Sequence, residues 1–123
     1  MIQIIFFILI LLQIKHWYID FVNQTSEEVA HKGIYLDWCG VKHSLKHGIA
    51  TAFIFLLFAP FETALILGIL DFLIHYHVDW AKMNINKKYG YTIEQPQFWA
   101  WLGADQLAHQ ITYIGLAYTL LPL

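Results

Sequence analysis

The sequence predicts an all-α, polytopic membrane protein, a four-helix transmembrane bundle with a short interfacial helix in its first cytoplasmic loop. Of the 123 residues, 59% are hydrophobic and 13% are charged, whereas soluble domains have about 25% charged residues. The apolar residues fall into four segments, at about 2–22, 41–58, 61–82 and 96–121. Each segment also carries two His or Asp residues four positions apart, which share one face of a helix. We therefore expect a single transmembrane domain whose polar faces turn inward.

Composition excludes several classes of protein. The chain has no arginine and a formal net charge of -2, so it lacks the basic face that a nucleic-acid-binding protein needs. Its single cysteine, Cys39, rules out an internal disulfide and a zinc site built from thiolates. The expected partners are membrane lipids and a divalent metal ion, and an oligomer is compatible with the sequence.

The first segment, 2–22, predicts a membrane span. It lacks the basic beginning and the small-residue cleavage site of a signal peptide. A span needs about 20 residues, more than the purely apolar part supplies, so the span includes His16 and Asp20. Ionisable side chains at membrane depth face protein or water. These two residues should therefore point into the bundle.

A short helix at the membrane surface is expected over Ser26 to Lys32. Thr25-Ser-Glu-Glu28 has the pattern of a capping box at a helix N-terminus, and Gly33 is placed to end the helix.

The segments 41–58 and 61–82 predict a helical hairpin with a tight turn between them. Gly48 and Gly68, each four residues from an alanine, would let the two backbones approach closely. The last segment begins at Pro96, a residue favoured in the first position of a helix.

The lysines predict the orientation in the inner (cytoplasmic) membrane. All lie on or beside the first and third connections, and none lies near the turn at Pro60 or either terminus. Because basic residues collect on the cytoplasmic side, those two loops are expected to be cytoplasmic and both termini outside. All four polar pairs then fall within roughly 15 Å of the cytoplasmic end. The lysines are Lys15, Lys32, Lys42, Lys46, Lys82, Lys87 and Lys88.

The four pairs predict a metal site. Buried ionisable groups are costly unless they are paired or bound to metal. Imidazole and carboxylate ligands without thiolate favour Zn, Mn or Fe, and the number of ligands suits one or two ions. The candidate ligands are His16, Asp20, His43, His47, His75, Asp79, Asp105 and His109.

Water on such a metal becomes a nucleophile near neutral pH. The leading hypothesis is therefore a metal-dependent hydrolase of a lipid or membrane-interface ester or phosphoester. Asp71, on the same helix face as His75 and Asp79, or a carboxylate outside the coordination sphere such as Asp79, is the candidate catalytic base. Lys82 would either extend to the membrane surface, which we favour, or hold an anionic group of the substrate.

Three other interpretations stay open. The chain could be a metal-stabilised structural protein or an ion or metal transporter, or the His and Asp pairs could hold helices together by hydrogen bonds without metal. A di-iron lipid oxidase is less favoured, because dinuclear carboxylate bundles use Glu-x-x-His rather than pairs four residues apart.

Four motifs in order resemble a small bacterial and phage integral membrane family, domain of unknown function 3307. They are His16-x-x-x-Asp20-Phe-x-x-Gln24, His43-x-x-x-His47, His75-x-x-x-Asp79-x-x-Lys82 and Asp105-Gln106-x-x-His109. The resemblance covers nearly the whole chain, supplies no established activity, and does not include Asp71. It implies that Gln24, Lys82 and Gln106 belong to the site or support its ligands. A looser likeness to membrane-bound metal-dependent hydrolases rests on similar His and Asp spacing alone.

Overall fold

The computed structural model describes residues 1–122, and every regular element in that range is helical. This confirms the all-α class. Along the chain the elements are α1 (Ile2–Trp17), the π-helix η1 (Tyr18–Val22), α2 (Ser26–His31), α3 (Trp38–Leu56), α4 (Phe61–Tyr89) and α5 (Pro96–Tyr118).

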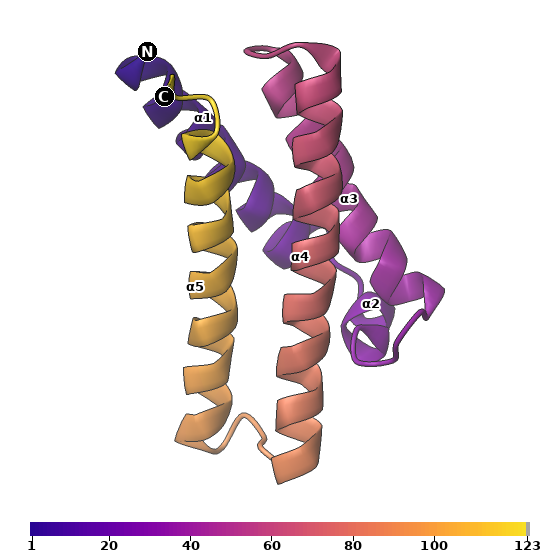
Figure 1. The fold of residues 1–123 in the computed structure, drawn as a ribbon. Coiled ribbons are helices and arrows are strands. Elements are labelled where there is room, and N and C mark those ends of the chain that lie inside the picture. The colour runs from indigo at the N-terminus through magenta and orange to yellow at the C-terminus, as the bar shows by residue number, and fades with distance from the viewer. Residues whose placement is uncertain (123) are drawn as a thin grey trace.

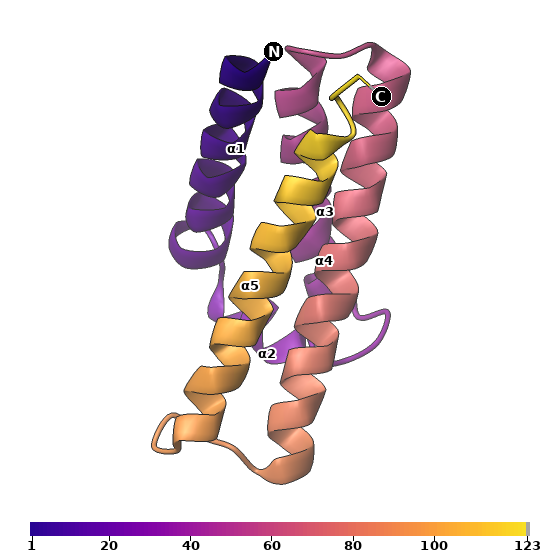
Figure 2. The ribbon, with the colours of Figure 1, turned by 60° about the vertical axis from the view of Figure 1, so that its left-hand side comes forward.

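The elements divide the molecule into two ends (Figures 1 and 2). Both chain ends and the turn between α3 and α4 lie at one end, while α2 and the connection from α4 to α5 lie toward the other. The lysine-bearing connections therefore share one end of the fold.

The predicted short helix is confirmed, together with its capping box. Thr25 accepts a hydrogen bond from the backbone N–H of Glu28, whose side chain accepts one from the N–H of Thr25. The predicted role of Gly33 is wrong, because the helix ends at Lys32 with a right-handed backbone. Gly33 instead allows close packing on α4, where an added Cβ would lie 3.0 Å from the Cβ of Met83.

Helices α3 and α4 approach most closely at their glycines. A Cβ on Gly48 would lie 2.7 Å from the carbonyl oxygen of Gly68, and a Cβ on Gly68 would lie 2.7 Å from the Cβ of Ala52. Since real Cβ atoms do not come this close to their neighbours, the helix pair needs hydrogen atoms at both positions.

Many large apolar side chains lie on the surface and many polar side chains lie in the interior, which is the reverse of the usual distribution in a soluble protein. Large hydrophobic side chains are exposed along α1, α3, α4 and α5, including Phe6 at 63% and Phe53 at 66%. The buried interior has two parts. One is a small apolar cluster, made of Ile8, Leu12, Phe55, Ala64, Leu67, Tyr113, Leu116 and Ala117. The other consists of buried His, Asp, Glu, Lys, Ser and Thr side chains.

Two helical segments, Ile2–Val22 and Phe61–Tyr89, are long and apolar enough to cross a membrane. Trp17, Trp38, Trp99 and Trp101 are exposed on the outer surface.

Candidate metal centre

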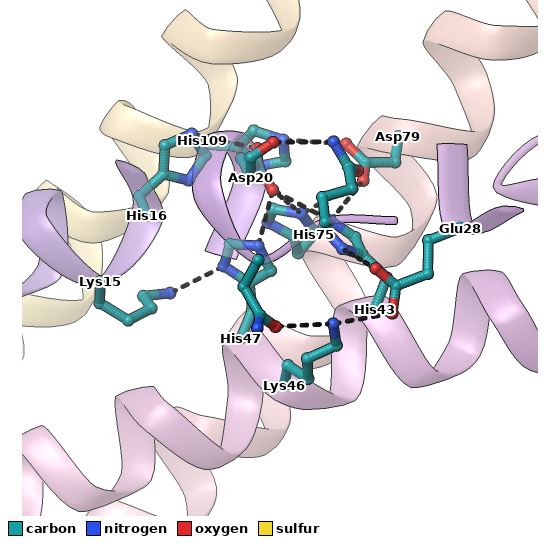
Figure 3. A network of polar contacts seen from close by, with 12 residues as sticks. Lys15, His16, Asp20, Glu28, His43, Lys46, His47, His75, Asp79 and His109 are labelled. Carbon is teal, nitrogen blue, oxygen red and sulfur yellow. Dashed lines mark hydrogen bonds and ion pairs between the residues drawn. The ribbon is translucent and has the colours of Figure 1, made fainter. Parts of the chain in front are cut away.

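The eight candidate ligands come together at the centre of the helices. Figure 3 shows most of them turned toward one another from α1, η1, α3, α4 and α5. Each is buried, with at most 6% of its surface exposed. The sequence predicted these residues from i, i+4 spacing alone, and the fold brings all eight to one place: His16, Asp20, His43, His47, His75, Asp79, Asp105 and His109.

The carboxylate of Asp20 is the centre of a first group. Its Oδ1 lies 2.8 Å from Nε2 of His47, 2.9 Å from Nε2 of His43 and 3.7 Å from Nε2 of His75. One ligand atom from each of these four residues lies within 4.8 Å of all the others. Three imidazole nitrogens and one carboxylate oxygen in that volume form a set that a divalent metal can bind.

Asp20 stands on a π-helical turn rather than an α-helical one. The N–H of Asn23 donates to the carbonyl of Tyr18, 2.8 Å away and five residues earlier. Short π-helical turns of this kind are frequent at functional sites. Here the turn still leaves Oδ2 of Asp20 3.3 Å from Nε2 of His16, so one carboxylate contacts ligands on both sides.

Asp79 is the centre of a second group, with His75 and His109. Its Oδ1 lies 3.1 Å from Nε2 of His109, and its Oδ2 lies 3.2 Å from Nε2 of His75. Oδ2 is also 3.5 Å from Nε2 of His43, a member of the first group. The His75 ring stacks between those of His47 and His109, with centroids 3.6 and 3.9 Å away. The two groups therefore form one continuous cluster.

Several buried atoms of the cluster lack hydrogen bonds. Within residues 1–122, both ring nitrogens of His43 and of His75 make no hydrogen bond of acceptable geometry, and neither do Oδ2 of Asp79 and Oδ1 of Asp105. The Nε2 and carboxylate atoms among them do lie within ion-pair distance of one another, of Asp20, of His109 or of Lys32. Leaving a buried polar atom unpaired costs about 1–3 kcal/mol. Metal coordination would satisfy one nitrogen of each ring together with carboxylate oxygens.

The far nitrogens of other rings are held from outside the cluster. Nδ1 of His16 lies 2.7 Å from the hydroxyl of Tyr113, and Nδ1 of His47 lies 3.2 Å from Nζ of Lys15. A metal-binding histidine usually donates its other ring N–H to an acceptor, which fixes the orientation of the ring. The Tyr113 hydroxyl can accept in this way, whereas the Lys15 ammonium can only donate. Nδ1 of His43 points toward Glu28, whose Oε2 is 3.8 Å away.

Nearly the whole chain matches one protein family. Residues 7–123 match the family described as "Protein of unknown function (DUF3307)". The chain belongs to the DUF3307 family. No curated protein and no solved structure matches it. The predicted family is confirmed, and its description assigns no activity to this chain.

The structure of this DUF3307 chain places the three further motif residues beside the ligands. The carbonyl oxygen of Gln106 lies 2.6 Å from Nε2 of His16, and its amide donates to Asp105 over 3.0 Å. Nζ of Lys82 lies 3.5 Å from Oδ2 of Asp105, with 12% of the side chain exposed. The favoured expectation that Lys82 extends to the membrane surface is therefore wrong. Gln24 donates to the backbone carbonyl of Asp20 over 2.7 Å.

Asp71 lies outside both groups of this DUF3307 site. Its Oδ2 accepts hydrogen bonds from Nζ of Lys15, 2.8 Å away, and from the hydroxyl of Thr51, 2.6 Å away. The stripe predicted on α4 is buried throughout, but Asp71 is bound by its own partners and does not join His75 and Asp79 in a candidate metal group.

Sequence reasoning missed two buried lysines, Lys15 and Lys32, which it used only as signals of membrane orientation. Nζ of Lys32 lies 3.1 Å from Oδ2 of Asp79. Burial alone would lower the pKa of Lys32, but the negative charges of Asp79 and Asp20 outweigh burial and raise that pKa above its ordinary value. Lys15 could have been found, because it continues the spacing of the buried residues Ile8 and Leu12.

Glu28 was also missed as part of the site, since the sequence showed only its capping role. It is fully buried, and Nζ of Lys46 lies 2.7 Å from Oε1. Burial would raise the pKa of Glu28, but its hydrogen bonds from Lys46 and the Thr25 N–H outweigh that effect and hold the pKa below its usual value.

The remaining histidines, His31 and His77, lie away from the cluster. His77 is exposed, and its ring contacts Tyr35 and the carbonyl of Leu73. His31 lies 3.1 Å from Asp37, which caps the N-terminus of α3.

Proposed function

We propose that this chain is a membrane-embedded, metal-dependent hydrolase of a lipid or membrane-interface ester or phosphoester. One observation carries the proposal. Imidazole nitrogens and carboxylate oxygens from η1, α3, α4 and α5 converge in a buried volume, where the His43 and His75 rings make no hydrogen bond of acceptable geometry within residues 1–122. Helix packing alone gives no reason to bury so many unpaired groups.

Exposure supports a position inside the membrane. The window that qualifies Ile2–Val22 as a span is 28% buried, and that of Phe61–Tyr89 is 33% buried. Central helices of soluble proteins are buried on most of their surface. The apolar surface of these helices therefore needs lipid around it.

We extend this placement to α3 and α5, which gives a four-helix transmembrane bundle. Helix α3 has 19 residues and α5 has 23, and at ~1.5 Å per residue both reach about 30 Å, the thickness of the hydrocarbon core. Their polar residues, such as His43, His47 and Asp105, are buried against the other helices. The grouping of α2 with the α4–α5 connection at one end (Figure 1) supports cytoplasmic lysine loops and external termini.

The donor set restricts the metal. Nitrogen and oxygen ligands without thiolate suit Zn, Mn or Fe. The first group, Asp20, His43, His47 and His75, would hold one ion, and Asp79 with His109 would hold a second. A bound ion of this kind lowers the pKa of coordinated water to about 7 and so supplies hydroxide as the nucleophile.

The chain's own residues then have distinct roles. Asp105 lies near His109, 3.4 Å from its Nε2, but is in neither candidate metal group. Its buried Oδ1 makes no hydrogen bond within residues 1–122, so we assign to Asp105 the role of general base. Asp71 is already bound to Lys15 and Thr51 and is the weaker candidate for that role.

A second candidate function is a metal-stabilised structural protein or a metal transporter. The number of ligands favours it, since the four side chains of the first group could fill a tetrahedral coordination shell and leave no position for water. A di-iron lipid oxidase is a third candidate, and iron bound at the site would favour it over hydrolysis.

The test is metal content, measured by elemental mass spectrometry on protein purified in mild detergent without a metal-affinity tag. We compare wild type with His75→Ala, and with His77→Ala as the control, because His77 lies on the same helix but is exposed. We expect one or two equivalents of Zn, Mn or Fe in wild type and in His77→Ala, and fewer in His75→Ala. Ester and phosphoester hydrolysis assays on the same samples then separate an enzyme from a structural metalloprotein. Absence of metal in all three after reloading would overturn the proposal.

A further inference from the structure

An apolar pocket between α4 and α5 reaches the metal cluster from the outer surface. Its volume is about 170 Å³, and Trp101, which is 40% exposed, stands at its edge. The residues around it are Val78, Ala81, Lys82, Ile85, Trp101, Ala104 and Asp105. The pocket therefore joins a surface suited to lipid chains with one of the candidate site residues.

Lys82 gives this pocket a positive charge next to the cluster. Its Nζ lies 3.5 Å from Oδ2 of Asp105. The same carboxylate accepts a hydrogen bond from the amide of Gln106 and lies 3.4 Å from Nε2 of His109, so its negative charge is shared among three partners rather than given to Lys82 alone. The ammonium group is then available to an anion that enters along the apolar walls.

The charges of the whole cluster also favour an anionic ligand. The carboxylates of Asp20, Asp79 and Asp105 face two ammonium groups, those of Lys32 and Lys82. A single divalent ion makes the sum of these charges positive, and a second ion makes it more so. Uncompensated charge in a buried site is costly, so the metal-loaded site should prefer a substrate that brings negative charge.

We infer that the α4–α5 pocket binds an anionic lipid through its phosphate. The phosphate contacts Nζ of Lys82, next to Asp105. The beginning of the acyl chain lies along Val78, Ile85 and Trp101. This inference rests on the proposed function and narrows its substrate from any membrane ester to a phosphate-bearing lipid.

The test measures binding rather than turnover. Phosphatidic acid with brominated acyl chains is titrated into metal-loaded protein in neutral detergent, and quenching of tryptophan fluorescence reports binding. Brominated diacylglycerol, which lacks the phosphate, is the matched ligand, and inorganic phosphate is added as a competitor. Trp101→Phe should remove the phosphate-dependent part of the quenching.

We expect wild type to bind phosphatidic acid about tenfold more tightly than diacylglycerol, the size of one charge-assisted contact. Lys82→Gln should remove that preference, while Lys82→Arg should keep it. Lys87→Gln is the control, because Lys87 lies on the same helix but not in the pocket.

The outcomes separate this inference from the proposed function. Equal affinity for the two lipids, or a preference that survives in Lys82→Gln, would overturn the inference alone. If inorganic phosphate competes with the same affinity as the lipid, the acyl chain contributes nothing to binding, and the assignment of the pocket to a lipid would be overturned. Lys82-dependent binding without hydrolysis of any lipid would keep the inference and remove the hydrolase.

Discussion

The buried ion pair between Lys15 and Asp71 makes a quantitative prediction about stability. Lys15 Nζ and Asp71 Oδ2 are 2.8 Å apart, and the two side chains are 5% and 1% exposed. Thr51 donates a second hydrogen bond to the same oxygen. The pair joins α1 to α4, and Nζ also contacts Nδ1 of His47. The perturbation is a double-mutant cycle of Lys15→Met, Asp71→Asn and the combined variant.

The expected loss of unfolding free energy depends on which charged group loses its partner. Asp71→Asn leaves the ammonium of Lys15 without its ionic partner, and Lys15→Met leaves the carboxylate with only Thr51. Removing one member of a buried pair costs about 3–5 kcal/mol, whereas replacing both by neutral groups costs much less. We therefore expect each single variant to lose about 3–5 kcal/mol, and the double variant to lose less than either single variant, which places it below the sum by about 3 kcal/mol or more.

The assay is reversible unfolding in mixed micelles of neutral detergent and dodecyl sulfate, followed by far-UV circular dichroism. Lys87→Met, on the exposed last turn of α4, is the control and should change stability by less than about 0.5 kcal/mol. Single variants that each lose less than about 1 kcal/mol, with a double variant equal to their sum, would refute the reasoning, because the pair would then behave as a hydrated surface ion pair.

Three further predictions concern the helices. Gly48→Ala should destabilise the fold by about 1–3 kcal/mol in the same unfolding assay, because its Cβ would collide with α4, whereas Gly103→Ala, with open space around it, should not. Thr25→Ala should cost about 1 kcal/mol and increase hydrogen exchange in α2, and unchanged exchange would argue against the capping box. Because folding lowers the pKa of Glu28, its stabilisation is present above the ordinary glutamate value of 4.5 and is lost as pH falls through the lower folded value. Hydrogen exchange in α2 of metal-free protein should therefore increase in wild type as the pH falls through the lowered pKa of Glu28. The increase should be much smaller in Glu28→Gln.

Helical geometry explains why the candidate ligands could be predicted from the sequence. A residue and its neighbour four positions on share a face in any α-helix, so His43 with His47 and Asp105 with His109 needed no knowledge of the fold. The high apolar content of the segments then required those faces to turn inward. The same reasoning found α2, since a capping box is a local pattern.

Residues whose role depends on tertiary contacts could not be found in this way. Tyr113 reaches His16 from a helix 97 residues away in sequence, and nothing in its local pattern distinguishes it from a core tyrosine. Lys32 lies on the first connection in the sequence, and only the packing of the segment after α2 against α4, at Gly33, brings it to Asp79. Asp71 shows the opposite error. Its spacing matched the stripe on α4, but its carboxylate is paired with Lys15 of α1 and is not part of the candidate metal groups.

The position of His75 determines how many metal ions the cluster can hold. It is a member of both candidate groups, but a single imidazole Nε2 can bind only one ion. The carboxylate of Asp79 contacts His109 with Oδ1 and both His43 and His75 with Oδ2, so it would be shared by the two groups if each held an ion. If His75 serves the first group, the second keeps Asp79 and His109, with Asp105 3.4 Å from His109.

We therefore expect two equivalents of metal in wild type. Asp79→Asn should weaken the binding of both ions, because the negative charge that the two groups share is lost. His75→Ala should remove only one ion, because the other group retains its own ligands. Elemental analysis after dialysis against a weak chelator distinguishes the two results. If wild type holds one equivalent and His75→Ala holds none, the groups form a single mononuclear site, and the contacts of Asp79 with His43 and His109 would then be hydrogen-bonding contacts around that one ion rather than a bridge.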